Sequence, residues 1–304
     1  MMSMNRQGRS ASRSAMVAAV TAALLVSGGS FAQNDAPRRG NSSGDDRRGE
    51  EQSFRSDKLT VFGLTTDQRL ISFTAKNPDK ERNIGSISGL QAPDTALIGI
   101  DFRVQDDMLY GVGNGGGIYT INQATAAATK VSQLTVALTG AFFGVDFNPA
   151  ANALRIVSDN GQNLRHPFAG ATAGVTQTDS PVNYAGVVAT GITGSAYVNN
   201  DADANTGTTL FALDSNLDQI AVQSPPNAGT LVATGKLTVD TGSNVGFDIY
   251  TTTSGTATTG NVAFASLTVG GKPAFYDVNL LTGKATLLGS LGVPLIDIAI
   301  PLDQ

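Results

Sequence analysis

The chain has 304 residues, 41% of them hydrophobic, with no cysteine and a formal net charge of −5 at pH 7. The lack of cysteine excludes disulfide scaffolds, thiol catalysis and cysteine metal sites. The acidic balance argues against nucleic acid or anionic lipid as a partner.

The N-terminal stretch Met1–Ala32 has the features of a secretory signal peptide. Arginines precede the apolar run Ala15–Val26, and small residues precede the expected cleavage after Ala32. The apolar run is shorter than the about 20 residues that span a bilayer. We therefore predict an exported protein, periplasmic or at the cell surface, with no membrane span after cleavage. The alternative is an uncleaved membrane anchor.

The next segment, Gln33–Lys58, mixes six basic with six acidic residues and has Phe54 as its one large apolar side chain. Such a segment buries too little apolar surface to offset the entropy of ordering, so it is predicted to be a disordered, charged linker. Residues 59–304 remain for one domain, with 11 basic and 19 acidic residues.

A repeated phrase organises this domain. Leu97–Phe102 and Phe142–Phe147 match at a spacing of 45 residues, and fainter copies follow at Ile192–Tyr197, Val245–Ile249 and Leu295–Ile298. Short apolar strands and turns at this period are typical of a β-propeller. We predict an all-β fold of five blades, with six as the alternative if one divergent blade escapes detection.

The ring is predicted to close through the chain ends. The first blade has three expected strands, Leu59–Leu64, Arg69–Thr74 and Asn83–Ile87, but lacks the repeated one. A spare copy lies at Leu295–Ile300. We expect this C-terminal strand to pair with the Leu59 strand, because closure removes the open sheet edges.

The sequence also predicts which residues face each other across one hairpin. Asn160 and Gly161 form a dipeptide typical of two-residue hairpin turns. A two-residue turn here places Arg155 opposite His166 and Arg165 on the other face.

Three further runs carry a family resemblance: Leu154–Arg165 (LRIVSDNGQNLR), Ala196–Asn200 (AYVNN) and Gln223–Leu231 (QSPPNAGTL). Together with the Gly-x-Asp-Phe openings, they resemble the bacterial exported domain family of unknown function DUF4394, over nearly all of residues 59–304. The resemblance implies a propeller-like secreted or surface domain and brings no established activity. The chain departs from the family pattern at Asp201 and Asp203, where small neutral residues are expected.

Four copies of the repeat carry an aspartate, and the copy in blade 4 has Ala196 instead. If the repeated strand is innermost, the carboxylates gather near the central channel. The favoured interpretation is structural, with each carboxylate accepting backbone N–H groups, because repeats preserve architecture. The alternatives are metal or ligand contact and acid–base catalysis of the glycosidase type. The four aspartates are Asp101, Asp146, Asp248 and Asp297.

An acidic loop offers a candidate calcium site. Asp201, Asp203 and Asn205 alternate as the first oxygen ligands of a calcium loop do. Gly207 comes one place late for an EF-hand, and Ala212 stands where a bidentate Glu is expected. A solvated hairpin loop is the alternative.

Blade 3 holds a polar cluster that offers a candidate ligand-binding site for a carboxylate, phosphate or sugar. The alternative is an intramolecular hydrogen-bond network. His166, as the single histidine, does not suffice for a zinc site without cysteines. The cluster consists of Arg155, Asp159, Gln162, Asn163, Arg165 and His166.

These patterns favour a non-catalytic binding or scaffold module, expected to be a monomer. Its partner would be a small molecule, a glycan or a protein, and calcium is the single candidate cofactor. The competing interpretation is a glycan-active hydrolase or lyase that uses the channel aspartates, so enzymatic activity stays open.

Overall fold

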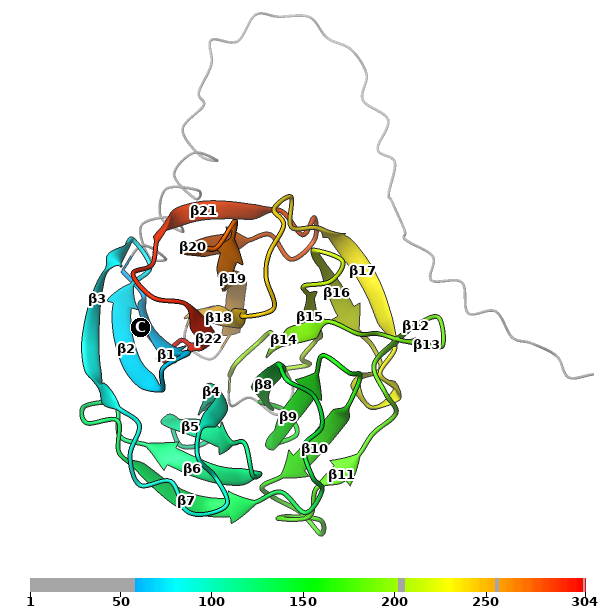
Figure 1. The fold of residues 1–304 in the computed structure, drawn as a ribbon. Helices are drawn as coiled ribbons and strands as arrows, with labels where there is room; N and C mark the ends of the chain where they lie inside the picture. Colours follow the sequence, from blue (N-terminus) through cyan, green and yellow to red (C-terminus); the bar gives the residue numbers. More distant parts are fainter. Residues whose placement is uncertain (1–57, 202–205, 255–256, 303) are drawn as a thin grey trace, which may run out of the picture. The chain divides into compact units, whose positions relative to one another are not determined.

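The computed structural model describes residues 58–201, 206–254, 257–302 and 304. These residues form five four-stranded antiparallel sheets arranged in a ring, a five-bladed β-propeller (Figure 1). The predicted signal peptide and the predicted linker, apart from Lys58, lie outside the described residues. No helix in the described part of the chain has the length and apolar character to cross a bilayer.

The strand order within each blade is the same, from the channel outward. Blade 1 contains β22 (Leu295–Ala299), β1 (Thr60–Thr65), β2 (Arg69–Thr74) and β3 (Asn77–Ser86). Blade 2 contains β4 (Leu97–Arg103), β5 (Met108–Gly113), β6 (Gly117–Ile121) and β7 (Ala128–Gln133). Blade 3 contains β8 (Phe143–Asn148), β9 (Ala153–Ser158), β10 (Asn163–Pro167) and β11 (Gln177–Thr178).

The remaining two blades follow the same plan. Blade 4 contains β14 (Ile192–Tyr197), β15 (Leu210–Asp214), β16 (Gln219–Gln223) and β17 (Leu231–Lys236). Blade 5 contains β18 (Gly246–Ser254), β19 (Ala257–Val269), β20 (Lys272–Val278) and β21 (Ala285–Ser290). A short ribbon of β12 (Asn183–Tyr184) and β13 (Val187–Val188) precedes blade 4, and a 3-10 turn, η1 (Pro226–Ala228), lies within it.

The ring closes as the sequence predicted. The C-terminal strand β22 pairs antiparallel with β1, with Phe62 opposite Ala299 and Leu64 opposite Asp297. The repeated phrase supplies the innermost strand of every blade, so β4, β8, β14, β18 and β22 surround the channel (Figure 1).

Close packing of these inner strands explains the glycine two residues before the aspartate position. A Cβ atom at Gly99 would lie 2.5 Å from a methyl carbon of Val145 in the next blade. A Cβ atom at Gly144 would lie 2.5 Å from the backbone nitrogen of Ser195. Only glycine allows inner strands to approach this closely.

The hydrophobic core is divided among the five junctions between blades. The junction of blades 5 and 1 is rich in aromatic rings, with Phe264 stacked on Phe275 at 5.3 Å. The junction of blades 3 and 4 is built from smaller side chains such as Val157, Ala212 and Ala221. The core therefore changes character around the ring.

The blade-3 hairpin differs from its predicted register by one residue. Arg155 pairs with Arg165, and Leu154 pairs with His166. The turn has three residues, because the Ser158 N–H bonds to the Gln162 carbonyl and Gly161 adopts a positive φ of 93°. The predicted register is therefore wrong, and the slip puts both arginines on one face of the blade and His166 on the other.

Candidate functional site

The four repeated aspartates form a buried belt around the channel. Their exposed fractions are 6% for Asp101, 2% for Asp146, 2% for Asp248 and 3% for Asp297. The inner position of the repeated strand brings them there. Oxygen atoms of Asp101, Asp146 and Asp248 lie within 4.8 Å of one another.

Each carboxylate of the belt clamps the next blade. Asp101 accepts a hydrogen bond from the Phe147 N–H at 2.7 Å, and Asp146 accepts one from the Tyr197 N–H at 3.1 Å. The same kind of bond reaches Asp248 from the Ile300 N–H at 2.7 Å, and Asp297 from the Ile100 N–H at 2.9 Å.

Three of the four carboxylates accept a second backbone bond, from the N–H of the residue that follows them. Phe102, Ile249 and Ile298 donate in this way to Asp101, Asp248 and Asp297, at 2.7, 2.6 and 2.9 Å. Asp146 accepts a single backbone bond among the described residues, because the Phe147 N–H donates to Asp101 instead. Blade 4 contributes no carboxylate to the belt, since Ala196 stands at the aspartate position. The belt is a structural clamp between blades.

Burial raises the pKa of every carboxyl in the belt. Desolvation is the largest cause in each case, and it raises the pKa of Asp248 to about 6. The pKa values of Asp101 and Asp146 rise well above the usual range through desolvation and then through repulsion from neighbouring carboxylates. Desolvation likewise raises the pKa of Asp297, against the lowering effect of its backbone hydrogen bonds. The four carboxyls thus favour their protonated forms more than exposed aspartates do.

The inner strand of blade 4 departs from the repeat at three positions. Where the other blades have an aspartate, β14 has Ala196. One and three residues earlier the other copies are apolar, whereas β14 has Ser195 and Thr193. Both hydroxyls are buried, each side chain being 1% exposed, and neither has a hydrogen-bond partner among the described residues.

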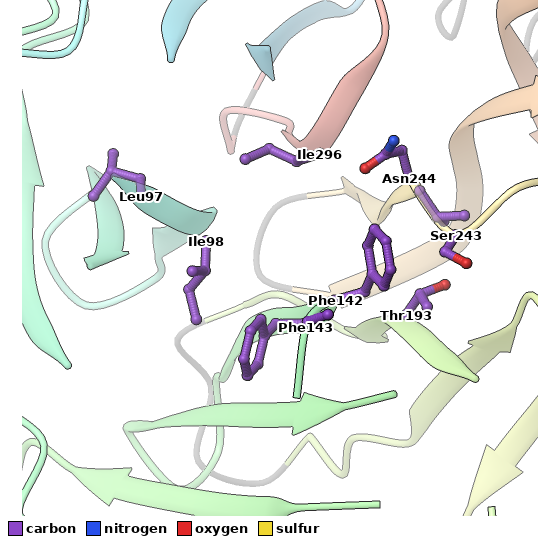
Figure 2. A pocket seen from close by; sticks show the side chains of 10 residues that line it. Leu97, Ile98, Phe142, Phe143, Thr193, Ser243, Asn244 and Ile296 are labelled. Carbon is purple, nitrogen blue, oxygen red and sulfur yellow. The ribbon is translucent and has the colours of Figure 1, made fainter. Parts of the chain in front are cut away.

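Thr193 lines a cavity of about 120 Å³ at the mouth of the channel. Figure 2 shows Thr193, Ser243 and Asn244 on one side of this cavity and Ile98 and Phe143 on the other. One wall is therefore polar and the other apolar. The cavity is lined by Leu97, Ile98, Ala141, Phe142, Phe143, Thr193, Ser243, Asn244, Val245 and Ile296.

The buried blade-3 cluster centres on Arg155, which is 1% exposed. Its guanidinium donates at 2.7 Å to each of Asn163, Asp179 and Asn227, and at 3.3 Å to the Tyr197 hydroxyl. These bonds tie β9 to β14 and to the η1 turn.

Arg165 lies on the same face and shares the Asp179 carboxylate with Arg155. Five guanidinium nitrogens, Nε, Nη1 and Nη2 of Arg155 and Nε and Nη2 of Arg165, therefore donate to oxygen atoms of the protein itself. The arrangement is that of an intramolecular network.

Two other members of the predicted cluster position the wall of the channel mouth. Asp159 accepts a hydrogen bond from the Ala141 N–H at 2.9 Å. Gln162 accepts from the Thr139 N–H at 2.9 Å and donates to the Ala137 carbonyl at 2.8 Å. They hold the segment that leads into β8, of which Ala141 lines the cavity.

His166 lies apart from the arginines. It is 1% exposed, and its ring nitrogens are 2.9 Å from the Ser132 hydroxyl and 3.0 Å from the Thr176 hydroxyl. Burial lowers its pKa. None of the six predicted cluster residues lines the channel-mouth cavity.

The predicted calcium ligands Asp203 and Asn205 lie outside the described residues. Asp201 is described, and one of its carboxylate oxygens accepts a hydrogen bond from the Thr258 hydroxyl at 2.8 Å. Calcium binding by this loop stays a prediction.

Sequence reasoning missed Thr193, Ser243 and Asn244 as site residues. For Thr193 a signal existed: aligned with the other copies, it stands where Ile98, Phe143 and Val245 are apolar. Ser243 and Asn244 lie in an ordinary polar connection before β18, and only the closed ring brings them beside Thr193.

The fold and its channel define the class of this protein as a five-bladed β-propeller. The chain belongs to the family described as Domain of unknown function (DUF4394), whose model matches residues 69–299. This confirms the resemblance drawn from the sequence motifs. No curated protein matches the chain.

Several solved structures match this chain with TM-scores below 0.5. One, from work on the de novo evolutionary emergence of a symmetrical protein, has a TM-score of 0.46 and 13% identity, over 81% of this chain and 100% of the other. A protein of unknown function from Bacteroides thetaiotaomicron has a TM-score of 0.43 and 12% identity, over 80% of this chain and 64% of the other. An auxiliary nutrient binding protein from Bacteroides ovatus has a TM-score of 0.36 and 12% identity, over 57% of this chain and 46% of the other. Similarities this low do not bear on function.

Proposed function

We propose that the protein is an exported, non-catalytic module that binds a small, uncharged, hydroxylated group at the mouth of its propeller channel. The group would be a single sugar ring, a polyol or the end of a larger glycan. The observation that carries this proposal is that Thr193 lines the cavity while its buried hydroxyl has no hydrogen-bond partner among the described residues. A buried polar group without a partner costs about 1–3 kcal/mol, and a ligand that bonds to it would recover that cost.

The chemistry of the walls supports an uncharged ligand. None of the ten lining residues is charged. Thr193, Ser243 and Asn244 offer hydroxyl and amide groups, which both donate and accept hydrogen bonds. Ile98 and Phe143 offer an apolar surface for the carbon face of a ring. A ligand with hydroxyls on one side and C–H groups on the other matches both walls.

The size of the cavity limits the ligand. About 120 Å³ is below the roughly 300–1,000 Å³ of sites that enclose a drug-sized molecule. A cavity of about 150 Å³ holds one benzene ring. The mouth therefore suits one ring or one terminal group, with the rest of a longer ligand lying outside.

The belt below the mouth favours a non-catalytic role. A glycosidase needs two carboxyl groups that reach the scissile bond. Here the four aspartates are at most 6% exposed and bonded to backbone N–H groups of neighbouring blades. The signal-peptide features of Met1–Ala32 support export.

The test is a thermal-shift screen of the purified chain against neutral monosaccharides, disaccharides and polyols. A ligand at one hundred times its Kd stabilises the folded state by about 2.7 kcal/mol. The variant Thr193→Val should fold, because the hydroxyl that it removes has no partner, and it should lose the ligand shift. Thr60→Val in β1 is the matched control and should keep the shift.

Two results would contradict the proposal. One is a shift that survives Thr193→Val unchanged, which would place the ligand elsewhere. The other is no shift with any compound of the panel, which would favour a scaffold that binds a protein partner.

A further inference from the structure

A second and larger cavity, of about 800 Å³, lies between blades 4 and 5. Its volume falls within the roughly 300–1,000 Å³ typical of small-molecule sites. We call it the blade 4–5 groove. It is lined by Val198, Thr209, Phe211, Asn261, Val262, Ala263, Asp277, Val278, Asn279, Leu280, Leu281, Thr286 and Leu288.

The groove has mostly apolar walls and a single charged group. Phe211, Val262 and Val278 form part of its lining, and Leu281 and Leu288 are 79% and 39% exposed. Asp277 is the one ionisable side chain among the lining residues. Exposed leucines beside a concave apolar wall are a feature of binding surfaces.

Asp277 is the unusual member of this lining. Its side chain is partly buried, yet it has no hydrogen bond or ion pair within the described residues. Burial raises its pKa. A partly buried carboxylate is normally satisfied by a donor, because its desolvation is otherwise uncompensated.

The polar side chains that line the groove, apart from Asp277, are uncharged. Asn261 is already engaged: its amide oxygen accepts from the Asn199 N–H and the Thr251 hydroxyl, and its amide nitrogen donates to the Asn199 side chain. A ligand that enters the groove therefore meets apolar surface, the uncharged polar side chains of Thr209, Asn279 and Thr286, and one negatively charged group, Asp277.

We propose that the blade 4–5 groove binds organic cations with an apolar body, with a primary ammonium placed against Asp277 and the body over Leu281 and Leu288. The ammonium supplies three N–H donors to a carboxylate that accepts no hydrogen bond from the described residues. The hydrocarbon body removes exposed leucine surface from water. This site is distinct from the uncharged channel mouth and does not depend on the function proposed there.

The test compares three probes of equal length on the full chain: hexylammonium, hexanol and hexanoate. Binding is followed by NMR titration, in which the shifted resonances also report the location. Hexylammonium should bind most tightly and hexanoate least. A charge-assisted hydrogen bond is worth enough to change affinity by about tenfold or more, so Asp277→Asn should weaken hexylammonium by that factor and leave hexanol unchanged.

The matched control is Asp79→Asn, which removes an exposed carboxylate from β3 in blade 1. It should leave all three affinities unchanged. Leu281→Ser should weaken hexylammonium and hexanol alike, because both use the apolar wall. Leu281 is 79% exposed, so this variant should fold.

The proposal is overturned if hexylammonium binds no more tightly than hexanol. It is also overturned if Asp79→Asn weakens hexylammonium as much as Asp277→Asn does, since the effect would then come from net charge. Thr193→Val should not alter hexylammonium binding; loss of binding in that variant would move the probe to the channel mouth and also refute the proposal.

Discussion

Two junctions between neighbouring blades are packed with different kinds of side chain. Between blades 5 and 1, aromatic side chains fill the space, with Phe73 edge-on to Phe275 at 5.0 Å and Phe264 stacked upon it. Between blades 3 and 4, the apolar cluster is small, and the buried guanidinium of Arg155 joins the blades. The same fold therefore accommodates an apolar junction and a polar junction between neighbouring blades.

The aspartate clamp does not follow this difference between the two junctions. It is present at both, where Asp248 accepts from the Ile300 N–H and Asp146 accepts from the Tyr197 N–H. The aspartate itself is missing from β14, where Ala196 stands in its place and two buried hydroxyls have no partner among the described residues. The polar junction and the altered inner strand belong to the same blade, which is also the blade that lines one side of the channel mouth with Thr193.

The largest effect is expected from breaking the apolar junction. Phe275 is fully buried between Phe73 and Phe264. Phe275→Ala removes both ring contacts and leaves a cavity, so it should lower the free energy of unfolding by about 5 kcal/mol. Chemical denaturation measures this change. Leu287→Ala, at an exposed position of β21, is the control and should stay within about 0.5 kcal/mol of the parent.

Breaking the polar junction should come next. Arg155→Met keeps the hydrophobic stem but removes donors to Asn163, Asn227 and the Tyr197 hydroxyl. We expect a loss of about 4 kcal/mol, because groups buried around the guanidinium lose their partners. Arg82→Met, at an exposed position of β3, is the control. A loss no greater than that of the control would show that the network contributes nothing to stability.

The aspartate clamp can be tested through pH. The pKa of Asp248 is raised to about 6 in the folded protein, from 3.8. The folded state therefore binds the proton more tightly than the unfolded state. This contribution to stability is present below about pH 4 and is lost as the pH rises through about 6. The loss is on the order of 3 kcal/mol, from 1.36 kcal/mol per unit of pKa.

Asp248→Asn should flatten this part of the stability profile measured by denaturation between pH 4 and pH 7. Asp79→Asn should keep the slope of the parent. An unchanged slope in Asp248→Asn would refute the assignment of this titration to the clamp.

The smallest effect concerns the altered strand of blade 4. Thr193→Val replaces an unpartnered buried hydroxyl with a methyl group and restores the apolar character of the repeat. We expect a gain of about 1 kcal/mol in the free energy of unfolding. A clear loss of stability would mean that the hydroxyl has a partner in solution, and the channel mouth would then lose its main argument for a ligand.

The sequence predicted much of the fold because the signals are local and repeated. The spacing of the Gly-x-Asp phrase predicted five blades, and the missing copy in blade 1 predicted the pairing of β22 with β1. The strand register predicted from Asn160 and Gly161 was wrong, because the same dipeptide also fits a three-residue turn with Gly161 at positive φ. That single residue decides which face carries Arg165.

The amino-acid sequence by itself determined the class of fold and the closure of the ring, because strand period and repeat length act along the chain. Only the tertiary structure decided that Thr193, Ser243 and Asn244 share one cavity and that Arg155 meets Asp179, Asn163 and Asn227. These residues come from segments that are distant in sequence, and their contacts exist only after the blades have packed around a common channel.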